Sequence, residues 1–146
     1  MPKKLRKNCL NCGKEPQRSY YKYCSNVCQN DFQYREYIRR WKSGDIIGLQ
    51  SLGIVSSHIK RYLREKFDNK CCECGWNKVN LITHVVPLVA DHIDGNWRNN
   101  SEDNLRLICP NCDSLTATYA GLNRGNGRIN RLRSKRAVEA RLFLKK

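Results

Sequence analysis

The stretch that decides the fold is Asn104-Leu105-Arg106-Leu107-Ile108-Cys109-Pro110-Asn111-Cys112-Asp113. Its two cysteines have the CxxC spacing, in which a tight turn directs both sulfurs at one metal ion. A partner pair lies earlier, in Cys71-Cys72-Glu73-Cys74-Gly75, with 34 residues between Cys74 and Cys109. Four thiolates complete a tetrahedral zinc site and leave no open position for water, so we expect this zinc to be structural.

The partner pair holds one cysteine too many, because Cys71 and Cys72 compete for one ligand position. Cys71 gives the CxxC spacing with Cys74, whereas Cys72 would give the tighter CxC. We therefore predict that Cys71 binds the metal and that Cys72 is spare.

Another four cysteines lie near the N-terminus and predict a further zinc site: Cys9, Cys12, Cys24 and Cys28. Apolar residues then recur at steps of seven, four and three, at Val27, Tyr34, Ile38 and Trp41, which predicts a helix from Ser25 to Ser43. A zinc knuckle, a short hairpin and a helix carrying the last thiols would form a treble-clef finger.

The rest of the chain predicts a small second module with few elements. Residues 44–57 are expected to form a connection, and helical spacing from Ser57 predicts an amphipathic helix. The β-branched segments 79–83 and 85–90 predict a hairpin, and Pro110 favours a helix that continues to Tyr119. The predicted organisation is a basic arm (1–8), a zinc finger (9–43), a connector (44–70), a second zinc module (71–121) and a basic tail (122–146).

Composition limits the classes of function. With 146 residues and a mean hydropathy of −0.73, the chain has little apolar material for a core, which suits metal-stabilised modules. The N-terminus lacks an apolar stretch typical of a signal peptide, so we expect a reducing, cytoplasmic compartment of a bacterial or phage-infected cell. No apolar run is long enough to predict a membrane span.

Positive charge is concentrated at the two ends. The chain carries 28 Lys and Arg against 13 Asp and Glu, a net charge of +15, and residues 1–8 and 122–146 hold 12 of these excess charges. Such arms favour a nucleic-acid partner, although a merely solvated tail is the alternative. The candidate DNA-binding residues are Arg124, Arg128, Arg131, Arg133, Lys135 and Arg136.

Asp91 and His92 are the candidate catalytic pair. Phosphodiester hydrolysis needs a base that activates water and a cation on the phosphate, and a neutral histidine suits the base role. Asp113 follows Cys112 directly, so it is a candidate second carboxylate for a magnesium-type ion. Without a metal role, Asp113 would be an acid favoured by the first turn of a helix.

These motifs, Asp91-His92, Asn104-Leu105 and Cys109-Pro110-Asn111-Cys112, resemble those of HNH endonucleases of the small phage or mobile-element type. The resemblance covers roughly residues 56–128 and implies an α+β fold in which a ββα-metal, treble-clef-like nuclease module accompanies the N-terminal finger. It implies that His92 is the general base, that Asp91 binds the catalytic ion and that Asn104 holds the histidine through hydrogen bonding. The family usually has a histidine at the position of Asp113, and RNA-guided CRISPR effectors similarly use another residue there.

The resemblance implies a DNA endonuclease with two structural zinc ions and one catalytic Mg²⁺ or Mn²⁺. Its partner would be DNA, expected to be double-stranded, and a homodimer would allow cleavage of both strands. The implied setting is phage DNA processing or homing. The rival hypothesis is a noncatalytic zinc-finger protein that binds nucleic acid and in which Asp113 has abolished metal capture.

Overall fold

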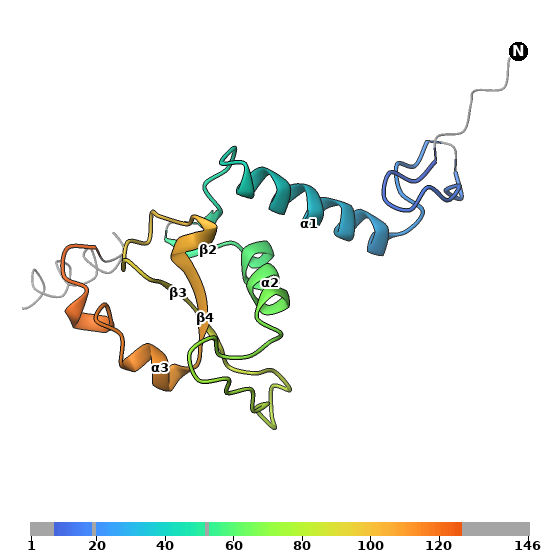
Figure 1. The fold of residues 1–146 in the computed structure, drawn as a ribbon. Helices are drawn as coiled ribbons and strands as arrows, with labels where there is room; N and C mark the ends of the chain where they lie inside the picture. Colours follow the sequence, from blue (N-terminus) through green and yellow to red (C-terminus); the bar gives the residue numbers. More distant parts are fainter. Residues whose placement is uncertain (1–7, 19, 52, 127–146) are drawn as a thin grey trace, which may run out of the picture.

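The computed structural model describes residues 8–18, 20–51 and 53–126 (Figure 1). It is a small α+β structure with two four-cysteine sites whose composition is compatible with zinc. The helices are α1 (Asn26–Lys42), α2 (Ser57–Lys66) and α3 (Pro110–Ser114), with short 3-10 helices η1 (Glu102–Asn104) and η2 (Ala120–Leu122). The strands are β1 (Leu49–Ser51), β2 (Ile54–Val55), β3 (Val89–His92) and β4 (Leu105–Ile108).

Helix α1 agrees closely with the predicted helix. It begins after Ser25, whose hydroxyl accepts a hydrogen bond from the Cys28 N–H at 3.2 Å, and ends before Ser43. Its apolar face buries Ile38 and Trp41, but Val27 is 69% exposed and does not extend that face as predicted. The reason is that the first turn lies beside the N-terminal cysteines, away from the body that covers the other end of α1 (Figure 1).

One hydrophobic core joins α1, β2, α2 and β4. Its buried residues are Tyr34, Ile38, Trp41, Val55, Ile59, Leu63, Leu105 and Leu107. Helix α2 has the predicted amphipathic pattern, and its Ile59 and Leu63 are fully buried. The C-terminal half of α1 therefore packs into the same core as the strand that precedes the second CxxC. The predicted domain boundaries remain predictions.

The strand assignments need correction. Residues 44–57 contain the short antiparallel hairpin β1–β2, which the sequence did not predict. The predicted pairing of 79–83 with 85–90 is wrong, because β3 pairs with β4 instead. The side chain of Asn80 accepts hydrogen bonds from the N–H groups of Ile82 and Thr83 at 2.9 Å, which closes residues 80–83 into a turn.

The last helix is shorter than predicted. Helix α3 ends at Ser114, whereas the sequence predicted a helix continuing to Tyr119. The hydroxyls of Ser114 and Thr116 donate to the backbone carbonyls of Asn111 and Asp113, at 2.7 and 2.9 Å. Such local bonds compete with helical ones, which explains why the chain leaves the helix here.

Among the described helices, none combines the length and the apolar character that a bilayer crossing requires.

Candidate active site

The second four-cysteine cluster supports the strand and the helix of the candidate site. The sulfurs of Cys71, Cys74, Cys109 and Cys112 all lie within 4.8 Å of one another. Cys74 and Cys109 are separated by 3.8 Å, which equals the sulfur–sulfur edge of about 3.8 Å expected for a tetrahedron with Zn–S bonds of about 2.3 Å. The thiols are free, and this spacing far exceeds a disulfide bond. The donor set therefore fits a zinc ion.

The structure separates the two candidate ligands Cys71 and Cys72. Burial raises the pKa of the Cys71 thiol, but hydrogen bonds with the backbone of Cys74, Cys109 and Glu73 outweigh burial and lower this pKa to about 6. Cys71 thus favours the thiolate that a metal needs. Cys72 is exposed, lies outside the cluster, and its backbone N–H donates to the Leu107 carbonyl at 2.9 Å.

The N-terminal cluster has the same character. The sulfurs of Cys9, Cys12, Cys24 and Cys28 also lie within 4.8 Å of one another. Cys24 is 3.5 Å from Cys12 and 3.4 Å from Cys28, again close to the edge of a zinc–thiolate tetrahedron. Turns form this cluster: within residues 8–18 and 20–25 the structure contains no strand, so the hairpin expected for a treble clef is not formed there as regular strands.

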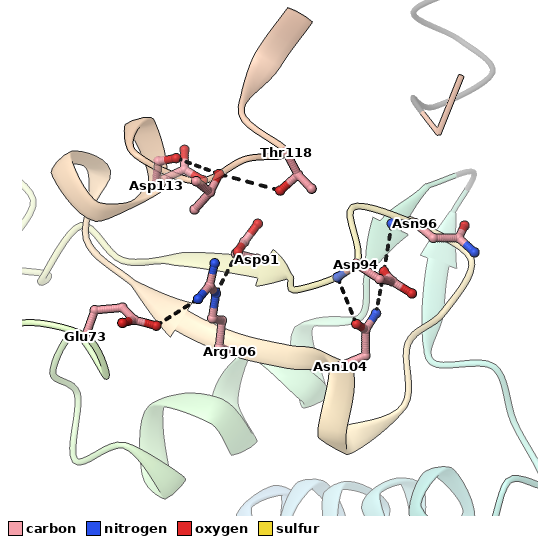
Figure 2. A network of polar contacts seen from close by, with 9 residues as sticks. Glu73, Asp91, Asp94, Asn96, Asn104, Arg106, Asp113 and Thr118 are labelled. Atoms are coloured by element: carbon pink, nitrogen blue, oxygen red, sulfur yellow. Dashed lines mark hydrogen bonds and ion pairs between the residues drawn. The ribbon is translucent and has the colours of Figure 1, made fainter. Parts of the chain in front are cut away.

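Asp91 lies on the antiparallel pair β3–β4, directly opposite Arg106. The Arg106 Nε donates to Asp91 Oδ2 at 2.8 Å, and its Nη1 donates to Glu73 Oε1 at 2.7 Å. The Asp91 side chain is only 12% exposed, so this cation balances a largely buried carboxylate. Figure 2 shows Asp91 between Arg106 and the segment that carries Asp113 and Thr118. Sequence reasoning missed Arg106, because its role depends on the pairing register.

Asp113 lies in the first turn of α3, where its N–H donates to the Cys109 carbonyl at 2.9 Å. The four-cysteine cluster that includes Cys109 and Cys112 therefore fixes its position. Partial burial raises the pKa of Asp113, and the negative charge of Asp91 raises it further, which outweighs the opposite effect of Arg106. Two carboxylates that repel each other in this way favour a shared cation, and their oxygen donors suit Mg²⁺ or Mn²⁺.

His92 ends β3, one residue after Asp91, so the pleat of the strand directs the two side chains to opposite faces. Its Nε2 lies 2.9 Å from the side-chain oxygen of Asn100, a buried residue of the loop between β3 and β4. Apart from the two cysteine clusters, the described residues hold no set of three ligand side chains gathered within 4.8 Å. Asp91, His92 and Asp113 therefore do not converge as a three-ligand site.

Asn104 stabilises the loop between the strands, whereas the resemblance implied that it holds His92. Its amide nitrogen donates to Asp94 Oδ1 at 2.8 Å, and its Oδ1 accepts from the Asp94 N–H at 3.1 Å (Figure 2). The amide nitrogen also donates to the Asn99 carbonyl at 2.7 Å. The residue that contacts the histidine is Asn100, which sequence reasoning did not single out. The sequence shows several asparagines in this loop, but it does not show which of them points inward.

The loop after Asp94 is closed by a segment that follows α3. Gly95 has a φ of 70°, and a Cβ placed there would lie 2.6 Å from Asn123 Oδ1 and 2.7 Å from the Thr118 methyl. The Asn123 amide donates to the Gly95 carbonyl at 2.7 Å. Only glycine fits this conformation and this close approach. Of the candidate DNA-binding residues, Arg124 follows this contact and is exposed, whereas Arg128, Arg131, Arg133, Lys135 and Arg136 lie outside the described residues.

Comparison with curated proteins gives a match to the H-N-H endonuclease F-TflIV of Escherichia phage T5. The two sequences are 39% identical over 93 residues, which is 62% of this chain and 40% of the relative. The chain thus spans about two fifths of the relative's length. No family model matches the chain, and no solved structure matches it significantly. The match confirms the resemblance to HNH endonucleases that the motifs indicate.

Proposed function

We propose that this chain is a metal-dependent HNH endonuclease that hydrolyses phosphodiester bonds in double-stranded DNA. The observation that carries the proposal is the placement of Asp91 and His92 at the end of β3, beside an Asp113 that is anchored by a four-cysteine cluster. The chain order β3, β4, α3 supports a ββα-metal module, and the N-terminal cluster with α1 supports a treble-clef finger. The similarity to a phage endonuclease supports the same chemistry.

In this proposal, each residue has one task. Asp91 and Asp113 would hold one Mg²⁺ or Mn²⁺, which when bound would neutralise charge on the scissile phosphate and on the departing oxygen. Neutral His92 would accept a proton from a water molecule, whose oxygen then attacks phosphorus opposite the leaving group. The P–O3′ bond breaks and the departing O3′ takes a proton from solvent water, which leaves a 3′-hydroxyl and a 5′-phosphate. Asn104 would preserve the loop that follows the histidine.

Arg106 has a defined place in this scheme. Its ion pair with Asp91 compensates the carboxylate when no divalent ion is bound, and Glu73 offers the guanidinium a second partner. Arg106 can therefore keep the contact with Glu73 while Asp91 turns an oxygen toward a cation. The zinc ions would stay structural, because each is surrounded by four thiolates.

The Asp91–Arg106 ion pair also favours a second candidate function. If Arg106 is the permanent partner of Asp91, the chain would be a noncatalytic zinc-finger protein that binds nucleic acid.

For the nuclease, one module provides one cleavage centre, so cleavage of both strands would need two copies or two encounters. Phage DNA processing or homing would be its setting.

A plasmid-nicking assay separates the two candidates. Wild-type protein, His92→Asn and the matched control His84→Asn are incubated with supercoiled plasmid and Mg²⁺ or Mn²⁺, and DNA binding is measured in parallel. His84 is exposed and has a φ of 55°, a conformation that asparagine tolerates. We expect His92→Asn to lose cleavage by a factor of about 100 or more while binding is retained, because its amide is no base.

The other results have equally clear meanings. Equal cleavage by His92→Asn and wild type would remove His92 from the mechanism. Binding without cleavage by wild type, with either metal, would favour the noncatalytic protein.

A further inference from the structure

Asn100 contacts both the proposed catalytic His92 and Trp41, which lies near the C-terminal end of α1. We propose that Asn100 is a positioning residue that fixes one tautomer of His92, and that Trp41 of α1 holds Asn100 in place. This inference rests on the proposed nuclease function. The observation that carries it is the hydrogen-bonded series Trp41, Asn100, His92, whose first two members are buried.

The amide of Asn100 has only one orientation that satisfies its neighbours. Its nitrogen donates to the backbone carbonyls of Trp97 and Arg98 at 3.1 and 3.3 Å. Carbonyl oxygens only accept, so the NH₂ group must face them and Oδ1 must face His92. Asn100 is 3% exposed, and water has little access to compete for these contacts.

This orientation determines which nitrogen of His92 carries the proton. Asn100 Oδ1 has no proton to donate, so the His92 Nε2 at 2.9 Å must donate. Neutral His92 is therefore the Nε2–H tautomer, and Nδ1 keeps the lone pair that can accept a proton from water. A free imidazole would divide its population between two tautomers and several ring orientations, and this contact prevents that division.

Trp41 fixes the backbone of Asn100. Its indole Nε1 donates to the Asn100 carbonyl at 2.7 Å, and its ring is buried in the core with Ile38. Trp41 lies in the last turn of α1, and the first turn of the same helix carries Cys28 of the N-terminal cluster. The helix that begins at one zinc-type site thus ends in a contact that supports the histidine.

Two other asparagines of the same loop, Asn96 and Asn99, make only contacts within the loop. Asn96 Oδ1 accepts from the Arg98 N–H, and Asn99 Oδ1 accepts from Ser101, which are local turn contacts. Asn99 is exposed, whereas Asn100 is buried and turned toward His92. Asn99 therefore provides a matched control with the same residue type in the same loop.

The experiment combines NMR spectroscopy with kinetics. Protein labelled with ¹⁵N-histidine has three imidazoles, which His58→Gln and His84→Asn assign by elimination. Long-range ¹H–¹⁵N correlations report the tautomer of neutral His92 in wild type, Asn100→Ala, Asn100→Asp, Trp41→Phe and Asn99→Ala. Plasmid cleavage then gives kcat and KM, and zinc content and circular dichroism check folding.

We expect wild type and Asn99→Ala to show the Nε2–H tautomer, and Asn100→Ala to show a mixture. In Asn100→Ala, kcat should fall about 10- to 100-fold while KM for plasmid changes less than about 2-fold, because DNA contacts are unaffected. Asn100→Asp keeps the acceptor for His92 but replaces the NH₂ donor to the Trp97 and Arg98 carbonyls by an oxygen, so it should restore the Nε2–H tautomer but only part of kcat. Trp41→Phe removes the donor to residue 100 and should give an intermediate decrease of kcat.

Contrary results point to different failures. A mixture of tautomers in wild type, or an unchanged tautomer in Asn100→Ala, would overturn the positioning role, even if every protein cleaves DNA. A change from the Nε2–H tautomer in wild type to a mixture in Asn100→Ala, with no cleavage by any protein, would support the contact and refute the nuclease proposal instead.

Discussion

Individual side chains set the charge of the candidate site before any ion binds. Asp91 and Asp113 place two acids near each other, and Arg106 neutralises one of them. An uncompensated buried carboxylate would be costly, so Arg106 lets the strand pair fold with Asp91 charged. The same guanidinium would compete with the proposed divalent ion. The affinity for such an ion would then depend on how readily Asp91 exchanges Arg106 for the ion while Arg106 keeps its contact with Glu73.

The choice between Cys71 and Cys72 gives a prediction about zinc content. We expect two zinc ions per chain in wild type and in Cys72→Ser, but one in Cys71→Ser, because only Cys71 lies within the four-sulfur cluster. Mass spectrometry of metals on purified protein measures this number. Cys71→Ser should also unfold more easily, because a structural zinc site contributes folding free energy directly. Full zinc occupancy in Cys71→Ser would show that Cys72 can replace it.

The two four-cysteine clusters were predictable from the sequence, but the partner of the histidine was not. Ligand spacing within CxxC is local, so Cys109 and Cys112 could be assigned without knowing the fold. His92 and Asn100 are eight residues apart in the sequence, so their contact depends on how the loop between them folds. Family resemblance suggested Asn104 as the partner, whereas Asn104 stabilises the loop through Asp94.

At the scale of elements, η1 connects the two long helices with the strand pair. Its first residue, Glu102, accepts a hydrogen bond from the Tyr62 hydroxyl of α2. Lys66 of α2 and Lys42 of α1 lie 2.9 and 3.2 Å from its carboxylate. The hydrogen bond from Tyr62 and those from the two lysines outweigh partial burial and lower the pKa of Glu102 to about 2. This carboxylate therefore holds the start of β4 against both helices.

A pH-dependent contribution to stability follows. Because the folded pKa of Glu102 lies below its ordinary value of 4.5, its contribution is full above about pH 4.5 and is lost as the pH falls toward about 2. We expect Glu102→Gln to lower the free energy of unfolding by roughly 1–3 kcal/mol at pH 7, with allowance for solvent screening. Urea denaturation at several pH values measures the difference from wild type.

Glu36→Gln is the control for this measurement. Glu36 forms an exposed ion pair with Arg39 within α1, and solvent screens such pairs so that they contribute little to stability. Protonation of the cysteine thiols at acid pH should affect both variants alike, so the comparison isolates Glu102. A constant difference between Glu102→Gln and wild type from pH 7 to pH 3 would exclude the carboxylate as its source.

Helices were easier to predict than strands in this chain, and the reason is physical. The hydrogen bonds of α1 and α2 are local, and their buried faces repeat with helical spacing at Ile38, Ile59 and Leu63. Strand β3 pairs with residues 13 or more positions later, and no local pattern identifies that partner. The apolar Leu81 and Ile82 are 86% exposed in a turn, so their composition misled the strand assignment.

At the scale of the whole molecule, α1 spans from one cysteine cluster to the proposed catalytic loop. Its first turn carries Cys28, its second half enters the common core, and Trp41 contacts the loop through Asn100. The N-terminal cluster is therefore not attached by a flexible connection to the rest. Any DNA contact made by the finger would have a defined position relative to β3 and α3.

The charge of the whole molecule gives the last prediction. Residues 122–146 hold nine basic residues against one acid, a net charge of +8, whereas residues 9–121 hold 15 basic residues against 12 acids, a net charge of +3. Each phosphate that such residues neutralise releases counterions, so the logarithm of the binding constant falls linearly with the logarithm of salt concentration. Replacing Arg128, Arg131 and Arg133 by Gln should reduce this slope by about 0.9 for each phosphate that is no longer neutralised on duplex DNA. Fluorescence anisotropy at several salt concentrations measures it.

A triple variant of α1 removes the same charge from a different surface: Arg35→Gln, Arg39→Gln and Arg40→Gln. These side chains are exposed along the helix, so the substitutions leave the core intact. If the tail binds phosphate, the tail variant reduces the salt dependence of the binding constant more than the α1 variant does. Nicking at low salt persists in both variants, because neither set of substitutions touches His92. Equal slopes in the two variants would mean that DNA responds to the total charge of +15 and that the tail does not itself bind phosphate.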